Sequence, residues 1–372
     1  MPNAYGLTTF HLMKILTKNK FQTWEKVKNL SSPKIIKQVI KSELTGKGGA
    51  NFSTGRKWEL SYPVKYLICN ADESEPGTFK DRFILQNNPE LLIEGINIAI
   101  KALRAEKTYI YLREEYKGLK PKFNKIIKKH SKYDIEVIIG AGAYICGEEM
   151  AQINSLEGFR AETRHKPPYP AQKGLFGEKT CVNNVETFAR LPLIWQDDFD
   201  PKLMLFAVSG DVKNPGIYEA TQGIGLVNLL KEAQPLNPKA IFLGASGGCL
   251  PYDDSLVLSH ENIRSKGAML GAGGIIVVSQ KRSIVNLCRS IIQFFVDENC
   301  GKCLPCREGN FRLLQLFQVY LKRKWTAEEF KLIKELIPFV EQGSQCALGQ
   351  SSTLHLQTAL QYFPEEFKAH VQ

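Results

Sequence analysis

Long apolar runs are absent from this sequence of 372 residues, and that absence limits what the protein can be. No stretch approaches the roughly eighteen uninterrupted apolar residues that a membrane-spanning helix needs. The opening MPNAYGLTTFHLMKILTKNK lacks the charged-then-apolar order of a secretory signal peptide. Internal repeats and low-complexity linkers are also missing. We therefore expect a cytoplasmic protein without direct membrane insertion.

Acidic residues are too few to balance the basic ones, and the formal net charge is +11. Nucleic acid is one explanation. However, the basic residues of 101–133 alternate with apolar residues at helical spacing, which is typical of a solvated helix face. No nucleic-acid-binding motif accompanies them. We expect a lysine-rich background and no nucleic-acid partner, with an acidic partner protein as a further option for some of these lysines.

Regular cysteine spacing is missing from most of the chain. Five of the nine cysteines lie in apolar or glycine-rich runs, which is typical of buried free thiols in a reducing compartment. These are Cys69, Cys146, Cys181, Cys249 and Cys288.

The other four cysteines are closely patterned: Cys300, Cys303 and Cys306 in ENCGKCLPCREG, and Cys346 in QCALG. Three thiolates at C-x2-C-x2-C spacing and a distant fourth are the ligand set that a 4Fe–4S cluster needs. Zinc is the alternative, but structural zinc sites usually draw two C-x2-C pairs or a pair plus histidines, and no second pair exists here. Unconnected reduced thiols are the remaining alternative.

At 372 residues the chain is longer than a single hydrophobic core usually organises, so we expect several domains. The order of the predicted helices and strands indicates where these domains divide. Between 64 and 149, strands alternate with helices, which predicts a doubly wound parallel sheet with ligands beyond the carboxyl ends of its strands. Around residue 200 the pattern changes to KLMLFAVSGDVKNPGIYEA, two strands around an Asn-Pro-Gly turn. From Ser283 onward helices dominate and predict a four-helix bundle with the cysteines at one end.

The fold class is therefore α/β, and we predict four parts. They are an N-terminal helical segment (1–42), a Rossmann-like domain (43–200), a small β-grasp α+β domain (201–282) and a helical domain (283–372).

Two glycine-rich loops follow predicted elements, but neither GKGGANFSTG nor GAGAYICGEE is a standard G-x-G-x-x-G, so each alone is weak support for a nucleotide site. Gly46, Gly48 and Gly49 free the backbone to approach a ligand. Lys57 closes the first loop, as a phosphate ligand would. A tight turn that binds nothing is the alternative.

Polar residues cluster in two further motifs. NADESEPG carries Asp72, Glu73 and Glu75 where ribose hydroxyls or a flavin ring would need acceptors. VNNVET brings together Asn183 and Asn184, whose amides offer both donors and acceptors. A solvated turn and a capped helix start are the respective alternatives.

These motifs together resemble a known family. GKGGANFSTGRKW, LICNADESEPGTFKDR, GAGAYICGEE, SLEGFRAETRHKPPYPAQKGLFG, TCVNNVET and ENCGKCLPCREG occur in the order found in the NADH-binding flavoprotein subunit of respiratory complex I. They are equally similar to the diaphorase subunits of NAD-reducing hydrogenases and NAD-linked formate dehydrogenases. The resemblance runs from Gly46 to about Phe363.

The resemblance implies FMN, NAD(H) and a 4Fe–4S cluster as cofactors, with residues carried over by motif. FMN phosphate and ribityl groups would be held by Gly46, Gly48, Lys57, Asn183, Asn184 and Thr187, and the isoalloxazine ring would face Asn70, Asp72 and Glu73. NADH would contact Phe52, Glu75, Glu149, Lys166 and Tyr169, with Phe52 and Tyr169 around its adenine. Cys300, Cys303, Cys306 and Cys346 would hold the cluster.

The implied activity is that of an NADH:acceptor oxidoreductase within a larger complex of the complex I, hydrogenase or formate dehydrogenase type. Nicotinamide releases two electrons as hydride and iron–sulfur clusters take one at a time, so a flavin must stand between them. Because this chemistry belongs to the cofactors, we assign no catalytic residue. The expected partners are a small thioredoxin-like 2Fe–2S subunit and a larger iron–sulfur subunit, with attachment to the inner membrane only through such partners.

Several residues depart from the family pattern. Lys47, Asn51 and Ser53 replace Arg, Gly and Pro, and a side chain at Asn51 projects where the family keeps none. Asparagine tolerates positive φ better than other non-glycine residues. Leu60 stands where an aromatic often flanks the adenine. These changes motivate the alternative of a flavin and iron–sulfur relay or scaffold that does not oxidise NADH, or that takes electrons from another donor.

Overall fold

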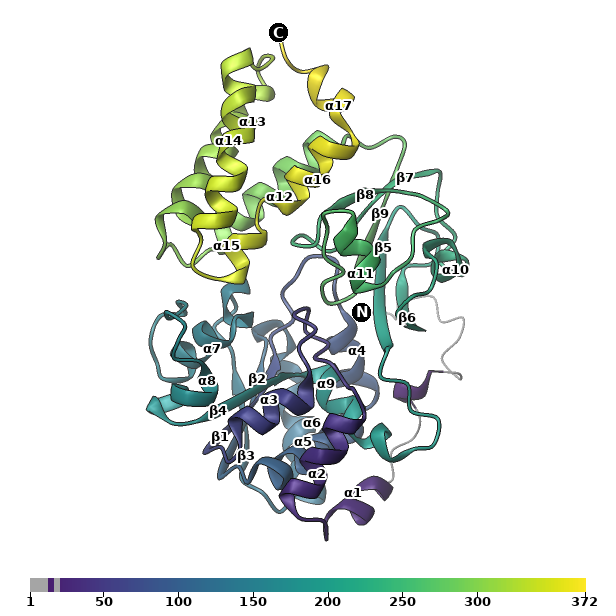
Figure 1. Cartoon of the computed structure of the whole chain (residues 1–372), viewed down its shortest axis with the longest axis vertical. Coiled ribbons are helices and arrows are strands. Elements are labelled where there is room, and N and C mark those ends of the chain that lie inside the picture. Colours follow the sequence, from purple (N-terminus) through teal and green to yellow (C-terminus); the bar gives the residue numbers. More distant parts are fainter. Residues whose placement is uncertain (1–12, 17–20) are drawn as a thin grey trace. The chain divides into compact units, whose positions relative to one another are not determined.

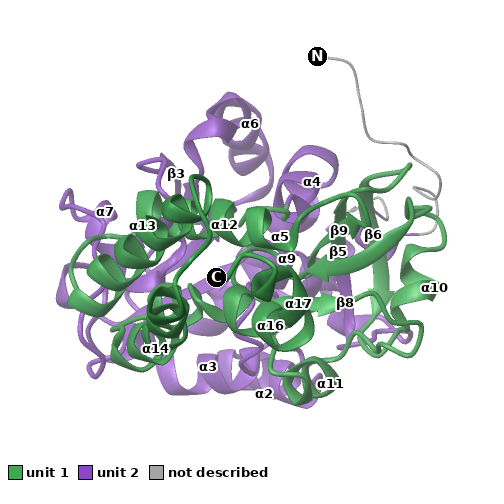
Figure 2. Cartoon of the chain, turned by 90° about the horizontal axis from the view of Figure 1, so that it is seen from above, with its two compact units in different colours: residues 1–6, 75–78, 206–372 green, residues 7–74, 79–205 purple. Residues whose placement is uncertain are grey.

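A computed structural model describes residues 13–16 and 21–372 (Figure 1). The described residues form two compact units (Figure 2). Unit 2 consists of 13–16, 21–74 and 79–205, and unit 1 consists of 75–78 and 206–372. The helices expected within 1–12 and 17–20 lie outside the described residues. The four-part division of the chain stays a prediction.

Unit 2 alternates helices with strands, as the sequence predicts between 64 and 149, and it has four strands. Its strands are β1 (Tyr66–Ala71), β2 (Lys107–Leu112), β3 (Ile135–Ile139) and β4 (Thr180–Asn184). Its α-helices are α1 (Gln22–Val27), α2 (Ser32–Lys41), α3 (Thr54–Ser61), α4 (Lys80–Asn87), α5 (Pro89–Leu103), α6 (Lys120–His130), α7 (Glu149–Leu156), α8 (Pro170–Lys173) and α9 (Val185–Arg190). Short 3-10 turns are η2 (Lys14–Leu16), η3 (Glu114–Leu119), η4 (Tyr144–Gly147), η5 (Leu175–Gly177) and η6 (Leu191–Trp195).

The sheet of unit 2 is parallel throughout and has the strand order β3-β2-β1-β4. Its longest helix, α5, is buried on nearly all sides, which explains its run of isoleucine, leucine and alanine. Pro89 occupies the first turn of α5, and Asn88 caps it by accepting the backbone N–H of Leu91. Strand β4 was not predicted, because TCVNN has polar residues at its end.

Unit 1 contains a mixed sheet and a set of C-terminal helices. The strands are β5 (Leu203–Gly210), which begins at the end of unit 2, β6 (Gly216–Thr221), β7 (Pro238–Phe242), β8 (Cys249–Pro251) and β9 (Gly274–Ser279). The helices are α10 (Leu226–Leu230), α11 (His260–Ser265), α12 (Ile284–Glu298), α13 (Asn310–Tyr320), α14 (Ala327–Gly343), α15 (Ala347–Ser351), α16 (Leu354–Tyr362) and α17 (Pro364–Lys368), with the π-helical turn η7 (Pro305–Gly309) before α13.

The five-stranded sheet has the order β6-β5-β9-β7-β8, in which β5 and β9 are parallel and β7 is antiparallel to both its neighbours. The predicted bundle is present as α12, α13, α14 and α16. One apolar core joins the sheet to these helices, since Phe242 of β7 packs in the same cluster as Ile292, Phe317 and Leu356. The sheet and the bundle are therefore stabilised together.

Among residues 13–16 and 21–372, no helix combines the length and the apolar character needed to cross a membrane.

Candidate cofactor sites

The carboxyl ends of β1 and β4 bring together residues from two distant motifs. In the parallel pairing of these strands, Asn70 of β1 lies opposite Asn184 of β4. On its other side β1 pairs with β2, so the strand order reverses between β1 and β4. Open parallel sheets bind ligands at such a point. The structure therefore places the predicted asparagines where a ligand site is expected.

The glycine-rich loop closes against this edge of the sheet. The backbone N–H of Gly46 donates to the carbonyl of Phe52 at 2.8 Å, which shapes the loop. A side-chain carbon added at Gly48 would lie 3.1 Å from Asn184 Cβ, tighter than most such contacts, so glycine at position 48 lets the loop approach β4 without displacing it. Such a close backbone approach is also what a phosphate cradle requires.

Two other residues of the loop explain how it tolerates its unusual sequence. Asn51 has a φ of +52°, in the left-handed region that asparagine accepts more easily than most residues, as expected. Lys47 is buried, and its ammonium donates to the carbonyl of Pro201 at 2.8 Å. Its backbone N–H donates to Thr187 Oγ1 at 2.9 Å, which joins the loop to α9. Burial lowers the pKa of Lys47 to about 8.

Asn183 is held from the side of α3. Its Oδ1 accepts from Trp58 Nε1 at 3.0 Å and from Cys181 Sγ at 3.4 Å. Both partners are buried, and burial raises the pKa of Cys181 to about 11. Cys181 thus behaves as a small buried thiol, as expected, and helps to orient Asn183.

The side chain of Asn184 caps a helix and also bonds to two charged residues. Its Oδ1 accepts the backbone N–H of Glu186 at 2.9 Å and caps α9, so the helix-cap alternative for this motif is realised. The same oxygen accepts from Lys80 Nζ at 3.3 Å, and Nδ2 donates to Asp81. The amide is fixed from both sides and presents a preformed edge at the end of β4.

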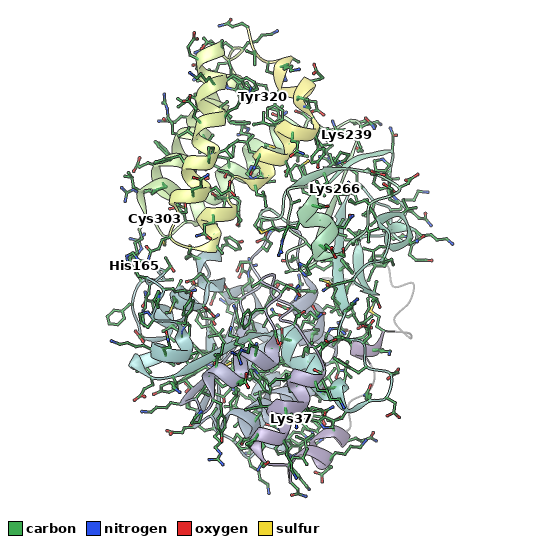
Figure 3. The ribbon with its side chains drawn as sticks, viewed as in Figure 1. Lys37, His165, Lys239, Lys266, Cys303 and Tyr320 are labelled. Carbon is green, nitrogen blue, oxygen red and sulfur yellow. The ribbon has the colours of Figure 1, made fainter. Side chains whose placement is uncertain are left out.

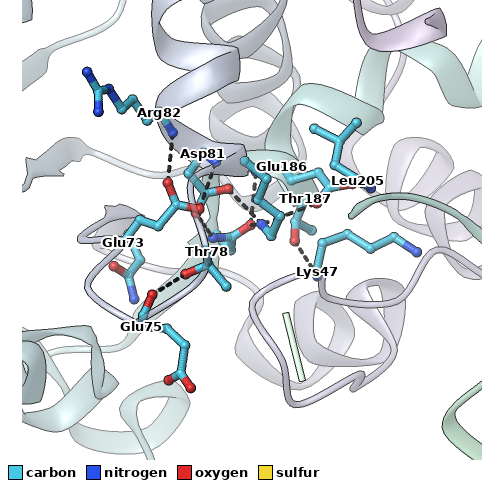
Figure 4. A network of polar contacts seen from close by, with 12 residues as sticks. Lys47, Glu73, Glu75, Thr78, Asp81, Arg82, Glu186, Thr187 and Leu205 are labelled. Carbon is cyan, nitrogen blue, oxygen red and sulfur yellow. Dashed lines mark hydrogen bonds and ion pairs between the residues drawn. The ribbon is translucent and has the colours of Figure 1, made fainter. Parts of the chain in front are cut away.

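A buried charge network that the sequence analysis missed supports this edge (Figure 4). Lys80 Nζ lies 2.7 Å from an Asp81 carboxylate oxygen and 3.2 Å from Glu186, and Arg190 lies 2.8 Å from Glu186. All four side chains are almost completely buried. Burial opposes the charge of Lys80, but Asp81 and Glu186 outweigh it and raise its pKa. In the sequence, the i, i+4 spacing of Glu186 and Arg190 inside an apolar segment is the feature that could have predicted this network.

Glu73, in the loop after β1, caps the start of helix α4. Its two carboxylate oxygens accept the backbone N–H groups of Asp81 and Arg82, each at 2.9 Å, in the first turn of α4 (Figure 4). Burial, together with the charge of Asp81, raises the pKa of Glu73 to about 7. Glu73 therefore positions the loop after β1 by fixing the start of α4.

The remaining predicted flavin contacts at β1 are also internally bonded. Asn70 Nδ2 donates to the carbonyl of Gly147 at 2.9 Å, and its Oδ1 accepts from Gln152 at 3.0 Å. Asp72 is buried and accepts from Ser74 Oγ at 3.1 Å. Asn70 thus joins β1 to the second glycine-rich loop.

Lys57, Glu149 and Lys166 meet although they come from separate motifs. Glu149, in the first turn of α7, lies 3.3 Å from Lys57 Nζ and 3.1 Å from Lys166 Nζ. Lys166 also lies 2.7 Å from Glu148, whose carboxylate caps α7. Burial opposes ionisation of Glu149, but the two lysines prevail and lower its pKa. The group offers two ammonium and two carboxylate groups to a polar ligand.

The other residues predicted to contact NADH are not part of the group of Lys57, Glu149 and Lys166. Phe52 and Tyr169 each keep 53% of their surface exposed. Glu75 belongs to unit 1, where its carboxylate accepts from the backbone N–H groups of Ala245 and Ser246, each at 2.8 Å. For Phe52, Tyr169 and Glu75, contact with a nucleotide stays a prediction.

The four patterned cysteines lie at one end of the bundle in unit 1; Cys303 is labelled in Figure 3. Cys300 and Cys303 lie in the loop after α12, Cys306 in η7 and Cys346 directly before α15. Burial, followed by the charges of the other three thiols, raises the pKa of Cys306 to about 12, so each of the other three thiols is within electrostatic reach of Cys306.

Two features beside these thiols, a tightly packed glycine and a buried hydroxyl, fit a bound group. Across the described ranges, no three His, Cys, Asp or Glu side chains gather closely enough for one metal ion. Zinc would need its sulfur ligands at about 2.3 Å. Gly349 leaves no room for a side chain, since an added carbon would lie 2.5 Å from Ser344 Oγ and 3.1 Å from Cys306 Cβ. Ser344 Oγ is buried without a hydrogen-bond partner among the described residues. A bound group beside the thiols would supply one.

Comparison with known proteins supports a flavin-binding domain and an iron–sulfur binding region in this chain. The chain matches two family descriptions, the Nuo51 FMN-binding domain over residues 39–193 and the NADH-ubiquinone oxidoreductase-F iron-sulfur binding region over residues 286–370. Similar proteins include the NADH-quinone oxidoreductase F subunit of Aquifex aeolicus, which is 37% identical over 100% of this chain and 96% of its own length. The α subunit of the NAD-reducing hydrogenase HoxS of Cupriavidus necator is 36% identical over 91% of this chain and 61% of its own length.

A crystal structure of an NAD+-reducing NiFe-hydrogenase in the H2-reduced state superposes with a TM-score of 0.89 and 33% identity. The match covers 96% of this chain and 65% of the hydrogenase chain, so this chain spans just under two thirds of that protein.

Proposed function

This chain belongs to the family of NADH-quinone oxidoreductase F subunits, and on that premise we propose how its residues divide the work of electron transfer. It is a flavin- and iron–sulfur-dependent oxidoreductase of the NADH dehydrogenase type, with FMN, a 4Fe–4S cluster and NAD(H) as cofactors. FMN supplies the exchange between two-electron hydride chemistry and single-electron transfer. The protein supplies binding, orientation and electrostatics.

The edge formed by β1, β4 and the glycine-rich loop holds FMN. The observation that carries this assignment is the 3.1 Å approach that a side chain at Gly48 would make to Asn184, at the reversal of strand order. Gly46 and Gly48 expose backbone to phosphate, and Thr187 fixes the loop through Lys47. Asn70 and Glu73 act mainly as positioning residues, because internal hydrogen bonds occupy both polar atoms of each side chain. Asp72 and Asn183, each held by one side-chain atom, would contact the flavin with the other.

Glu149 and Lys166 recognise NADH, while Lys57, paired with Glu149, would hold the FMN phosphate. Lys57 and Lys166 would meet phosphate, while Glu149, kept ionised by both, would accept from ribose hydroxyls. Phe52 and Tyr169 offer exposed rings for an adenine, and Glu75 tunes affinity by its charge.

Cys300, Cys303, Cys306 and Cys346 are the cluster ligands in this proposal, and they work within a larger assembly. Expected partners are a small thioredoxin-like 2Fe–2S subunit and a larger iron–sulfur subunit. The similarity to subunits of a quinone oxidoreductase and of a hydrogenase supports membership of a complex. We propose the cytoplasm as its compartment.

Anaerobic titration with NADH tests the assignment. The purified chain, reconstituted with FMN, iron and sulfide, should lose flavin absorbance on adding NADH. Lys166→Met should raise the NADH concentration for half reduction by about tenfold, the loss of roughly one charge-assisted contact. Lys173→Met, an exposed lysine at the end of α8, is the matched control and should change nothing.

Two results would contradict the proposal. Reduction by dithionite but not by NADH would indicate another electron donor and revive the relay alternative. Equal titrations for Lys166→Met and Lys173→Met would remove Lys166 from the nucleotide site.

A further inference from the structure

The amide of Asn310 lies beside one of the four cysteine thiols. Asn310 is the first residue of α13 and is completely buried. It directly follows η7, and π-helical turns are frequent at functional sites. Its Nδ2 lies 3.7 Å from Cys306 Sγ, 2.8 Å from the Cys306 carbonyl oxygen and 3.0 Å from Ser352 Oγ. One amide group therefore contacts both the backbone and the sulfur of Cys306.

The neighbours of this amide fix which end faces the thiol. The carbonyl oxygen of Cys306 can only accept a hydrogen bond. The hydroxyl of Ser352 donates to the carbonyl of Gly349 at 2.9 Å, so its oxygen is left to accept from Asn310. Both contacts require the NH2 side of the amide. The N–H groups therefore point toward Cys306 and Ser352.

A purely structural role accounts poorly for an asparagine here. The Oδ1 atom of Asn310 is buried and has no hydrogen-bond partner among the described residues, which costs about 1–3 kcal/mol. A threonine could satisfy the same carbonyl four residues back without burying an unpaired oxygen. What asparagine adds is a second N–H and enough length to reach the sulfur. Nδ2 carries two N–H groups and has three acceptors within reach, so one N–H is shared between two acceptors and Cys306 Sγ is the most distant of the three.

Hydrogen bonds to ligating sulfurs are one of the factors that set the reduction potential of an iron–sulfur cluster. One-electron reduction adds one negative charge to the cluster and its thiolates. An N–H donor stabilises the more negative state, and a buried donor acts in a medium of low dielectric constant. The donor therefore favours the reduced form.

We propose that Asn310 tunes the cluster by donating a hydrogen bond to the Cys306 thiolate and thereby raises its reduction potential. This inference rests on the proposed function, since it takes Cys306 as a ligand. Asn310 does not react itself; it is a positioning residue that acts through Cys306. Its contribution would bring the cluster closer to accepting an electron from the flavin.

Potentiometric titration of the whole reconstituted chain, followed by electron paramagnetic resonance, measures the effect. Asn310→Leu should shift the equilibrium between reduced and oxidised cluster about 3- to 10-fold toward the oxidised form. That is a midpoint roughly 30–60 mV lower, at 59 mV per tenfold for one electron. Asn310→Thr should give the same shift while retaining the contact to the Cys306 carbonyl, and it decides the matter if the leucine variant does not fold.

Thr358→Val is the matched control. Thr358 is buried in the same bundle and accepts from the backbone N–H of Cys249, so its replacement by valine removes a buried hydrogen bond without touching Cys306. The control should keep the wild-type potential. An unchanged potential in Asn310→Thr with a full complement of iron would overturn the inference, as would an equal shift in Thr358→Val.

Failure of the inference can be told from failure of the proposed function. If Cys306→Ser retains an unaltered cluster, the ligand assignment is wrong and the inference is lost with it. If Cys306→Ser loses or alters the cluster while the Asn310 variants keep their potential, only the inference is wrong.

Discussion

The flavin edge of unit 2, formed by β1, β4 and the glycine-rich loop, is stabilised differently from the thiol set of unit 1, which comprises Cys300, Cys303, Cys306 and Cys346. In unit 2, Asn183, Asn184 and Glu73 are engaged by protein partners, and the charges beneath them are paired. In unit 1, burial first and then each of the other three thiols opposes the ionisation of Cys306. The first site is complete as a protein structure, whereas the second gains its compensating charge from what it binds.

This difference indicates where a ligand is needed for stability. A preformed site loses little when its ligand leaves, because its polar groups keep their partners. A set of thiolates must be deprotonated to bind metal and repels itself without it, so binding and folding are coupled. We expect removal of FMN to leave unit 2 folded and removal of the cluster to loosen the end of the bundle.

Loss of one cysteine ligand is the strongest way to sharpen this comparison. Cys346→Ser should abolish the 4Fe–4S signal in electron paramagnetic resonance and raise hydrogen exchange between 300 and 351, while FMN stays bound. Cys288→Ser, which changes a buried thiol of α12 outside the set, should keep the full iron content. Retention of a 4Fe–4S cluster by Cys346→Ser would contradict the ligand assignment.

The charge network should make unit 2 sensitive to a single buried cation. Lys80→Met leaves Asp81 and Glu186 without their shared partner and should destabilise unit 2 by about 3–5 kcal/mol in denaturant unfolding. Lys117→Met breaks an exposed pair with Glu114 and should cost less than about 1 kcal/mol. Equal effects of the two substitutions would show that the network does not support the edge.

Glu73 should give unit 2 a pH dependence. Its pKa is raised from 4.5 to about 7 in the folded chain, so the folded state holds this proton more tightly. The resulting stabilisation is fully present below about pH 4.5 and is lost as pH rises to 7, by up to roughly 3 kcal/mol. The stability advantage of the wild type over Glu73→Gln should therefore shrink as pH rises from 4.5 to 7.

Glu106→Gln, at an exposed glutamate before β2, is the control for this titration and should run parallel to the wild type. A difference between wild type and Glu73→Gln that does not change with pH would mean that Glu73 does not hold the proton.

Local patterns predicted much of the fold and of the thiol set. Alternating strands and helices indicated the parallel sheet, and the spacing of Cys300, Cys303 and Cys306 indicated that they lie together between α12 and α13. These features depend on residues close in sequence. The resemblance to a known family predicted the cofactors, which the comparisons confirm.

Features that depend on distant residues were not predicted. Lys80 and Glu186 are 106 positions apart, and neither sequence segment shows that the other will be its partner. Strand β4 was missed because its polar end, Asn183 and Asn184, is held in the sheet by pairing with β1 rather than by apolar composition. The contact of Asn310 with Cys306 required the π-helical turn, for which the sequence gives no signal.

The smallest expected effect concerns Asn51, the departure that raised doubt about the nucleotide site. Because Asn51 already has a φ of +52°, Asn51→Gly removes a mild backbone strain but adds freedom to the unfolded chain. These contributions oppose each other, so stability should change by less than about 0.5 kcal/mol. Asn51→Val, with a β-branched side chain at positive φ, should cost about 1–2 kcal/mol. Thermal unfolding measures both.

The same pair of variants also tests whether the loop is preformed. If asparagine leaves the backbone in the conformation that glycine would take, Asn51→Gly should reduce its flavin at the same NADH concentration as the wild type. A tenfold gain in NADH affinity would show instead that the Asn51 side chain obstructs the nucleotide. In that case the chain could still bind FMN, but the Asn51 side chain would hinder the access of NADH. This result would support the alternative of a relay that does not oxidise NADH.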